Sequence, residues 1–141
     1  MLRRIIFLAA LLMVPGSFAS RVSAQTRVEV VDQSEDPVGR RLVFRVRDAL
    51  RSSSAFVLVG QEGTRVKLLV DSMDRFKGES ETEGVSTMYA VVWTLVYEEG
   101  GSTHEEFLDV RIGYAGEHTL ADTAEGIVAD TDQLIESYRK H

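Results

Sequence analysis

The sequence predicts an α+β fold, a two-layer sandwich in which two helices cover one face of a mostly antiparallel five-stranded sheet. Two segments carry apolar residues at helical spacing, and five carry the alternation or the β-branched composition of strands. They follow one another in the order β-α-β-β-β-β-α. Neither a repeat nor an internal linker divides them, so residues 25–141 are predicted to form a single domain.

The first half of this domain begins with a strand at 26–31, where three valines lie in the run TRVEVV. Asp36-Pro37 is typical of a helix N-cap followed by proline at the first helical position. The helix continues to about residue 53, where three consecutive serines end it. A short strand at 56–59 follows. A right-handed crossover makes the strands at 26–31 and 56–59 parallel neighbours.

The second half is predicted to be an antiparallel meander. A strand at 65–71 leads to a polar, acidic loop at 77–84, which we expect to be mobile. The longest strand, 85–97, is joined to a strand at 103–112 by a tight turn, because paired glycines supply the positive φ that such turns need. After residue 116, an amphipathic helix continues to the end of the sequence.

The hairpin turn also predicts which side chains share a face. Counting back from the turn sets Trp93 opposite Leu108, and a matching register sets Leu68 opposite Trp93. One face is therefore predicted to be apolar and to pack against both helices. Its members are Val66, Leu68, Val70, Tyr89, Val91, Trp93, Leu95, Leu108, Val110 and Ile112.

The opposite face of the sheet is predicted to be largely apolar as well. A sheet with one solvated face normally alternates apolar and polar residues, and the strand at 85–97 does not. A second copy, another protein and the acidic loop are the candidates to cover this face. Its members are Leu69, Met73, Met88, Ala90, Val92, Thr94, Val96 and Phe107, with Lys67, Asp71, Asp109 and Arg111 around them. Within it, the candidate interface residues are Leu69, Met88, Val92, Val96 and Phe107.

Residues 1–24 are predicted to be a cleavable signal peptide. Two arginines precede the apolar run 5–14, and Val22-Ser23-Ala24 fits a small-x-small cleavage motif that leaves Gln25 as the first mature residue. Cleavage after Ala19 and an uncleaved anchor are the alternatives. The run is shorter than the about 20 residues that span a bilayer. We therefore expect an exported bacterial protein, in the periplasm first and the medium second, without stable membrane insertion after cleavage.

Composition excludes several chemistries. Cysteine is absent, which rules out disulfides, a thiol nucleophile, a thiolate metal site and a lipid-anchor cysteine. Asparagine is also absent, so there is no N-glycosylation sequon. After residue 24 the chain has 13 basic and 22 acidic residues, a net charge of −9. That sign disfavours nucleic acid as a partner.

No catalytic, cofactor-binding or metal-binding residue is predicted. His104-Glu105-Glu106 lies in a strand, where neighbours point to opposite faces, and His118 with Asp122 supplies two ligands where a usual site needs three or four. Ser52-Ser53-Ser54 has no histidine near it in sequence, and no G-x-S-x-G motif occurs. We therefore expect no enzyme activity and no cofactor, and a hydrolase is the least favoured class.

The helix at 37–53 carries five arginines on an otherwise acidic chain. Arg40, Arg47 and Arg51 fall on one side of it and form a candidate basic patch. The alternative is that these arginines pair with acidic neighbours such as Glu35 and Asp48, as exposed charges on helices commonly do.

Val38-Gly39-Arg40-Arg41-Leu42 and the segment 50–58 form a helix that ends in Arg-Ser and is followed closely by Phe and a strand. This pattern resembles the TolB amino-terminal domain family and the related domains of curli-secretion and penicillin-binding-protein-activating lipoproteins. The resemblance covers about twenty residues and implies a helix lying on a small sheet, with a role in protein–protein contacts in the bacterial envelope. The chain lacks the lipid-anchor cysteine of the lipoproteins and the β-propeller that follows in TolB.

The sequence therefore predicts a non-catalytic binding or assembly domain, from a family of small exported bacterial proteins, that acts on a protein partner or on itself. The alternative is a periplasmic carrier that holds a small apolar ligand beneath the loop at 77–84.

Overall fold

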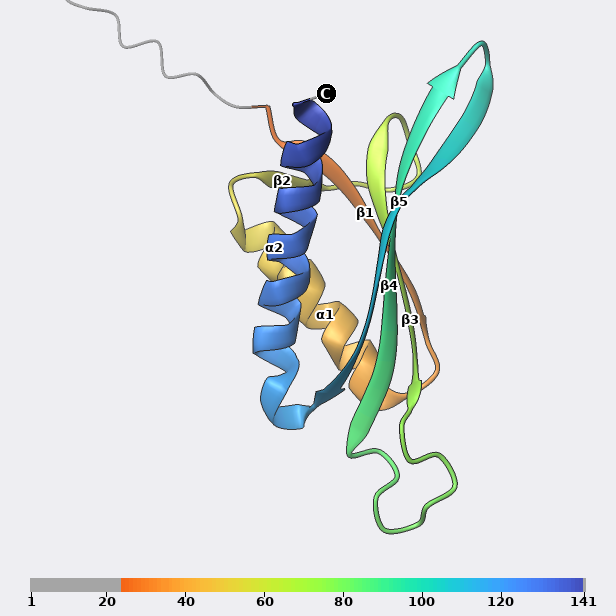
Figure 1. Cartoon of the computed structure of the whole chain (residues 1–141), viewed down its shortest axis with the longest axis vertical. Coiled ribbons are helices and arrows are strands. Elements are labelled where there is room, and N and C mark those ends of the chain that lie inside the picture. Colours follow the sequence, from red (N-terminus) through yellow and green to blue (C-terminus); the bar gives the residue numbers. More distant parts are fainter. Residues whose placement is uncertain (1–23, 141) are drawn as a thin grey trace, which may run out of the picture.

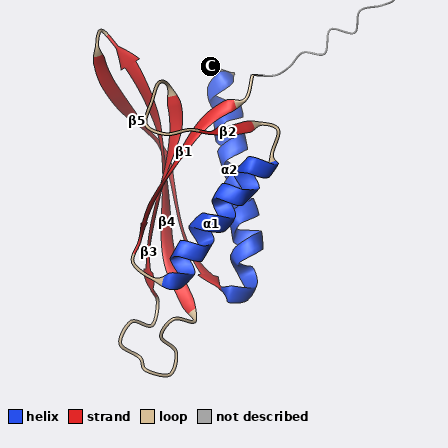
Figure 2. Ribbon diagram, turned by 180° about the vertical axis from the view of Figure 1, so that it is seen from behind, coloured by secondary structure: helices blue, strands red, loops and turns tan. Residues whose placement is uncertain are grey.

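The computed structural model of the protein describes residues 24–140, and the predicted signal peptide before Ala24 lies outside them. As predicted, the fold is an α+β sandwich with two helices on one face of a five-stranded sheet (Figure 1, Figure 2). The strands are β1 (Thr26–Ser34), β2 (Phe56–Leu58), β3 (Arg65–Asp74), β4 (Ser86–Glu99) and β5 (Ser102–Gly116). The helices are α1 (Pro37–Ser52) and α2 (Leu120–Arg139), and a short 3-10 helix, η1 (Glu117–Thr119), leads into α2.

Helix α1 begins where the sequence predicts it. Asp36 is the N-cap, because its Oδ1 accepts a hydrogen bond from the backbone N–H of Gly39 at 2.8 Å, and Pro37 takes the first helical position. The apolar stripe of the helix faces the sheet. Its fully buried side chains are Val38, Leu42, Val43, Val46 and Leu50. Burial of this stripe against the sheet stabilises α1 more than helix propensity does.

Strand β1 lies between β2 and β3 and is parallel to both, so the sheet order is β2-β1-β3-β4-β5. The predicted parallel pairing of β1 with β2 is confirmed. The predicted antiparallel meander of β3, β4 and β5 is confirmed as well, and the sequence did not indicate that β1 pairs with β3. β1 forms three register pairs with β2 and seven with β3. Its valine-rich sequence suits this place, because β-branched residues pack well in strands and Val28 is fully buried in the core.

The β4–β5 hairpin turns at Gly100 and Gly101, whose φ angles are 60° and 84°. Two-residue hairpin turns need this left-handed backbone, as the sequence predicts. The predicted register between β3 and β4 is also confirmed, with Leu68 opposite Trp93. The hairpin extends past the other strands at its end of the sheet (Figure 1).

The core lies between the helices and the sheet, and Trp93 is its largest fully buried side chain. Trp93 is 2% exposed, and its indole Nε1 donates a hydrogen bond to Oγ1 of Thr131 in α2 at 2.9 Å. A buried N–H without an acceptor would cost about 1–3 kcal/mol, so this bond permits the complete burial of the ring. The predicted position of Trp93 between sheet and helices is confirmed.

Candidate functional site

A β-bulge in β5 decides which side chains reach the far side of the sheet. Phe107 lies opposite Thr94. The next pair is Asp109 with Trp93, so Leu108 has no opposite residue. Because neighbouring residues of a strand point to opposite faces, the extra residue reverses the alternation beyond it. The residues that consequently face the helices are Asp109, Arg111 and Gly113, and those that face away are Val110, Ile112 and Tyr114.

The sequence-based assignment of this part of β5 is therefore wrong. It assumes unbroken alternation from the hairpin turn, which holds as far as Phe107. Val110 and Ile112 do not pack against the helices but are 46% and 70% exposed on the far side. Leu108 does not lie opposite Trp93. Conversely, Asp109 and Arg111 face the helices, although the sequence predicts them on the far side.

Contacts on the helix side explain why the bulge is stable. A Cβ on Gly113 would lie 2.6 Å from Oη of Tyr89, so the tyrosine ring lies across the glycine. Nearby, NH1 of Arg111 donates to Oδ2 of Asp130 in α2 at 2.6 Å. Burial opposes the charge of Arg111, but the bond to Asp130 and the proximity of Tyr89 outweigh it and raise the pKa above its ordinary value. The arginine therefore stays charged, and it joins β5 to α2.

No helix lies over the far side of the described sheet (Figure 1, Figure 2). Cross-strand neighbours there form adjacent rows, among them Leu69–Val92–Val110 and Met73–Met88–Tyr114. Neighbours in such rows are within contact distance, so the apolar patch is continuous. We call it the open face. Its members are Leu69, Met73, Met88, Ala90, Val92, Phe107, Val110, Ile112 and Tyr114.

The large side chains of the open face are substantially exposed. Ile112 is 70% exposed, Phe107 60%, Tyr114 59%, Val110 46% and Met73 44%. Single exposed apolar residues are common on proteins. These five belong to one patch, in which Met88, Ala90 and Val92 of β4 connect Met73 with the four residues of β5. A contiguous apolar patch of several hundred Å² is typical of an interaction site.

Four of the five predicted interface residues lie on the open face. Leu69, Met88 and Val92 are half-buried, and Phe107 is exposed. Val96 is 3% exposed and offers no surface, so it does not belong to the open face. Sequence reasoning missed three members, which are Val110, Ile112 and Tyr114. One signal could have revealed Val110 and Ile112. They alternate with the charged residues Asp109 and Arg111, and counting this alternation from the C-terminal end of the strand places them on the other face.

A charged cluster borders the open face toward the hairpin. Nε of Arg65 donates to Oε2 of Glu29 at 2.6 Å, and both side chains are 9% exposed. Nζ of Lys67 lies 2.5 Å from Oε1 of Glu105, which also accepts a hydrogen bond from the hydroxyl of Thr94 at 2.8 Å. The bonds from Lys67 and Thr94 outweigh burial and lower the pKa of Glu105. The cluster is therefore internally paired and neutral.

The acidic loop between β3 and β4 projects beyond the end of the sheet and does not lie over the open face (Figure 1, Figure 2). Asp74 holds its base, because its carboxylate accepts hydrogen bonds from the backbone N–H groups of Phe76 and Gly84. The hollow beside the loop is lined mainly by charged residues, including Glu35, Asp36, Asp74, Lys77 and Glu83. Such a lining does not suit an apolar ligand.

The three arginines of the predicted basic patch lie on α1, and each makes a contact. NH2 of Arg47 donates to the backbone carbonyl of Val30 in β1 at 3.0 Å. NH1 of Arg51 lies 3.5 Å from the carboxylate of Asp48. NH1 of Arg40 is 3.5 Å from the backbone carbonyl five residues before it. Arg47 therefore joins α1 to β1, whereas Arg40 and Arg51 remain exposed.

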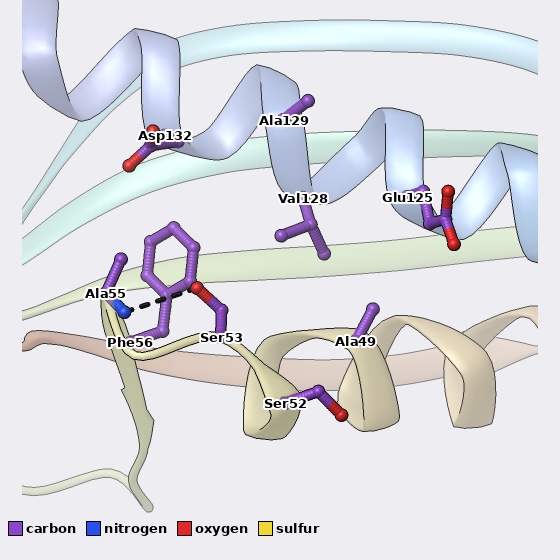
Figure 3. A pocket seen from close by; sticks show the side chains of 9 residues that line it. All are labelled: Ala49, Ser52, Ser53, Ala55, Phe56, Glu125, Val128, Ala129 and Asp132. Atoms are coloured by element: carbon purple, nitrogen blue, oxygen red, sulfur yellow. Dashed lines mark hydrogen bonds between the residues drawn. The ribbon is translucent and has the colours of Figure 1, made fainter.

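A groove of about 430 Å³ runs between the end of α1 and the middle of α2 (Figure 3). Phe56 and Val128 line it beside the carboxylates of Glu125 and Asp132. The hydroxyl of Ser53 accepts a hydrogen bond from a backbone N–H at 3.2 Å. A nucleophilic serine needs a neighbouring base, and no histidine is among the residues of the described chain that line the groove.

Two absences hold for the described segment, residues 24–140. That segment contains no group of three or more His, Asp or Glu side chains placed to hold a metal ion. Nor does it contain a helix long and apolar enough to cross a membrane. No protein-family model matches the chain, and no curated protein matches it. The function is therefore inferred from the geometry of the open face.

Proposed function

We propose that this chain is a non-catalytic binding domain of the bacterial envelope, which acts through protein–protein contacts made by its open face. The observation that supports this role is the bulge at Leu108, which turns three large apolar side chains onto a face that no helix covers. Apolar surface left in water forgoes roughly 25 cal/mol per Å². A partner that covers the open face gains that free energy, less the costs of association.

The alternatives receive less support. A carrier for a small apolar ligand needs an enclosed and mostly apolar cavity, whereas the hollow beside the loop at 77–84 is lined mainly by charged side chains. A hydrolase needs a nucleophile next to a base, whereas the hydroxyl of Ser53 caps a backbone N–H. A binding surface requires neither a cavity nor a reactive group.

Export is part of this proposal and depends on residues 1–24. We expect the mature chain to begin at Gln25, because cleavage follows a small-x-small motif. The intact mass of the protein recovered from its source cells measures this directly. A mass that still includes all 24 residues would contradict cleavage, and a mass that corresponds to cleavage after Ala19 would move the site.

The binding role can be tested with a photo-reactive amino acid placed at Ile112 and, as a matched control, at Phe44. Both side chains are large, apolar and well exposed, at 70% and 58%. Phe44 lies on α1, on the helix side of the sheet. In the source cells we expect light-dependent adducts with protein from position 112 and not from position 44. Equal adducts at both positions, or none at either, would contradict a binding role for the open face.

A further inference from the structure

We propose that the partner of the open face is a second copy of this chain, packed face to face about a two-fold axis. This inference rests on the proposed binding role of the open face and names its partner. Three features of the described residues support it: the state of the sheet edges, the exposed apolar area and the distribution of charge.

Backbone groups on both sides of the sheet are already hydrogen-bonded to side chains of the same chain, which hinders the addition of a strand there. β2 pairs only with residues 26–28 of β1, so the rest of β1 forms the edge on that side. There the carbonyl of Val30 accepts a hydrogen bond from Arg47, and the N–H of Ser34 donates to the carboxylate of Asp32 at 2.9 Å. On the opposite edge, the N–H of Val110 donates to Oδ1 of Asp109 at 2.8 Å, next to the bulge. Occupied backbone groups and bulges protect edges from pairing. A second copy therefore meets the sheet through side chains of its face.

The exposed apolar area is large enough for a dimer. The five most exposed side chains of the open face are between 44% and 70% exposed. With large apolar side chains of roughly 150–200 Å² each, they present roughly 500 Å². Two copies packed face to face would bury about 1,000 Å² from these residues, which reaches the lower limit of specific interfaces. The half-buried members, such as Leu69 and Val92, add to this area.

The open face is also a neutral region of an acidic molecule. After residue 24 the chain has 22 acidic and 13 basic residues, but the charged cluster that borders the open face is internally paired. Two further charges of opposite sign lie at its rim. Asp71 is opposite Ala90, and the guanidinium carbon of Arg75 is 4.7 Å from the centre of the Tyr114 ring. Among the described residues, neither lies within 4.0 Å of an oppositely charged side chain.

This charge pattern favours a second copy over a different partner. A two-fold interface is self-complementary, because each patch meets an identical patch. Two neutral apolar faces with one rim charge of each sign can meet without net repulsion, although the whole molecules are acidic. A partner selected by charge would instead be basic and would contact the acidic surfaces away from the open face.

Sedimentation equilibrium of the purified mature protein tests this inference, with Ile112→Glu as the disrupting variant and Phe44→Glu as its control. Both positions are exposed in the single chain, so both variants should fold, which circular dichroism and urea unfolding verify. We expect the wild type and Phe44→Glu to be dimers. Ile112→Glu should raise the dissociation constant at least about 100-fold, because the symmetry removes two isoleucines and introduces two charges.

Two results would overturn the second copy as partner. One is a wild type that stays monomeric up to about 1 mM, the weak end of specific affinities. The other is a dimer that Ile112→Glu leaves unchanged, because it would use another surface. If Ile112→Glu does not fold, Tyr114→Ser on the same face replaces it.

The photo-adducts separate this inference from the proposed binding role. If the wild type is monomeric and position 112 forms adducts with a different protein, the second copy is overturned and the binding role is kept. A monomeric wild type together with an absence of photo-adducts from position 112 would contradict both the second copy and the binding role.

Discussion

The carboxylate of Asp36 accepts a hydrogen bond from the hydroxyl of Thr87 at 2.8 Å, although the two residues are 51 positions apart in the sequence. The same Oδ2 accepts a bond from the hydroxyl of Ser72 at 2.8 Å, while Oδ1 caps the N–H of Gly39. One buried carboxylate thus ties the start of α1 to β3 and β4. Burial raises the pKa of Asp36, but the bonds from Gly39, Thr87 and Ser72 outweigh it and hold the pKa below its ordinary value.

We expect Asp36 to stabilise the fold at neutral pH and to lose that contribution in acid. Its pKa is lower in the folded chain than in the unfolded chain, where it is about 3.9. The contribution is therefore complete above about pH 5 and is lost as the pH falls through the folded pKa. Asp36→Asn should reduce the free energy of unfolding by about 1–3 kcal/mol at neutral pH. Urea unfolding of both proteins should show this difference shrinking below about pH 4. A difference that is constant with pH would contradict the role of the charge.

Gly39 allows α1 to approach β3 closely. A Cβ at this position would lie 1.7 Å from Oγ of Ser72, whose hydroxyl bonds to Asp36. We expect Gly39→Ala to lower the free energy of unfolding by about 1–3 kcal/mol or more, because overpacking displaces that hydroxyl. Gly60→Ala is the control, since nothing lies within 4 Å of its added Cβ. Equal urea midpoints for the two variants would show that the approach is not tight.

Local chemistry explains which parts of the fold could be predicted from the sequence. Asp36-Pro37 marks the start of α1 because a capping carboxylate and a fixed proline φ act within a few residues. Gly100 and Gly101 mark the hairpin for the same reason, since glycine has no Cβ and adopts a positive φ without steric cost. The prediction that the sheet has an apolar second face is also local, because it follows from the lack of apolar and polar alternation in the strand at 85–97.

The bulge at Leu108 could not be predicted in this way, because contacts between distant residues fix it. Tyr89 lies across Gly113, and Arg111 pairs with Asp130 in α2. Alternation counted from the turn contains no local marker of the bulge, so Val110 and Ile112 are predicted for the wrong side of the sheet. The place of β1 between β2 and β3 is similarly decided by pairing across the sheet.

Trp93 and Thr131 should be energetically coupled. We expect Trp93→Ala to lower the free energy of unfolding by about 3–5 kcal/mol, the usual range for a large buried aromatic. Thr131→Val should cost about 1–3 kcal/mol, because it leaves the indole N–H buried without its acceptor. Trp93→Ala should therefore cost less in the Thr131→Val background than in the wild type. Strictly additive costs in urea unfolding would contradict a stabilising hydrogen bond between the two side chains.

Hydroxyl-radical labelling of the open face tests its binding role most directly. Met73, Phe107 and Tyr114 are 44%, 60% and 59% exposed in the single chain, and Phe44 and Tyr138 on the helices are comparable references at 58% and 46%. The comparison is between the native envelope fraction and the purified protein at high dilution. In the envelope fraction we expect several-fold slower labelling of the three open-face residues, with the two references unchanged. Equal labelling of all five residues in both samples would contradict a covered open face.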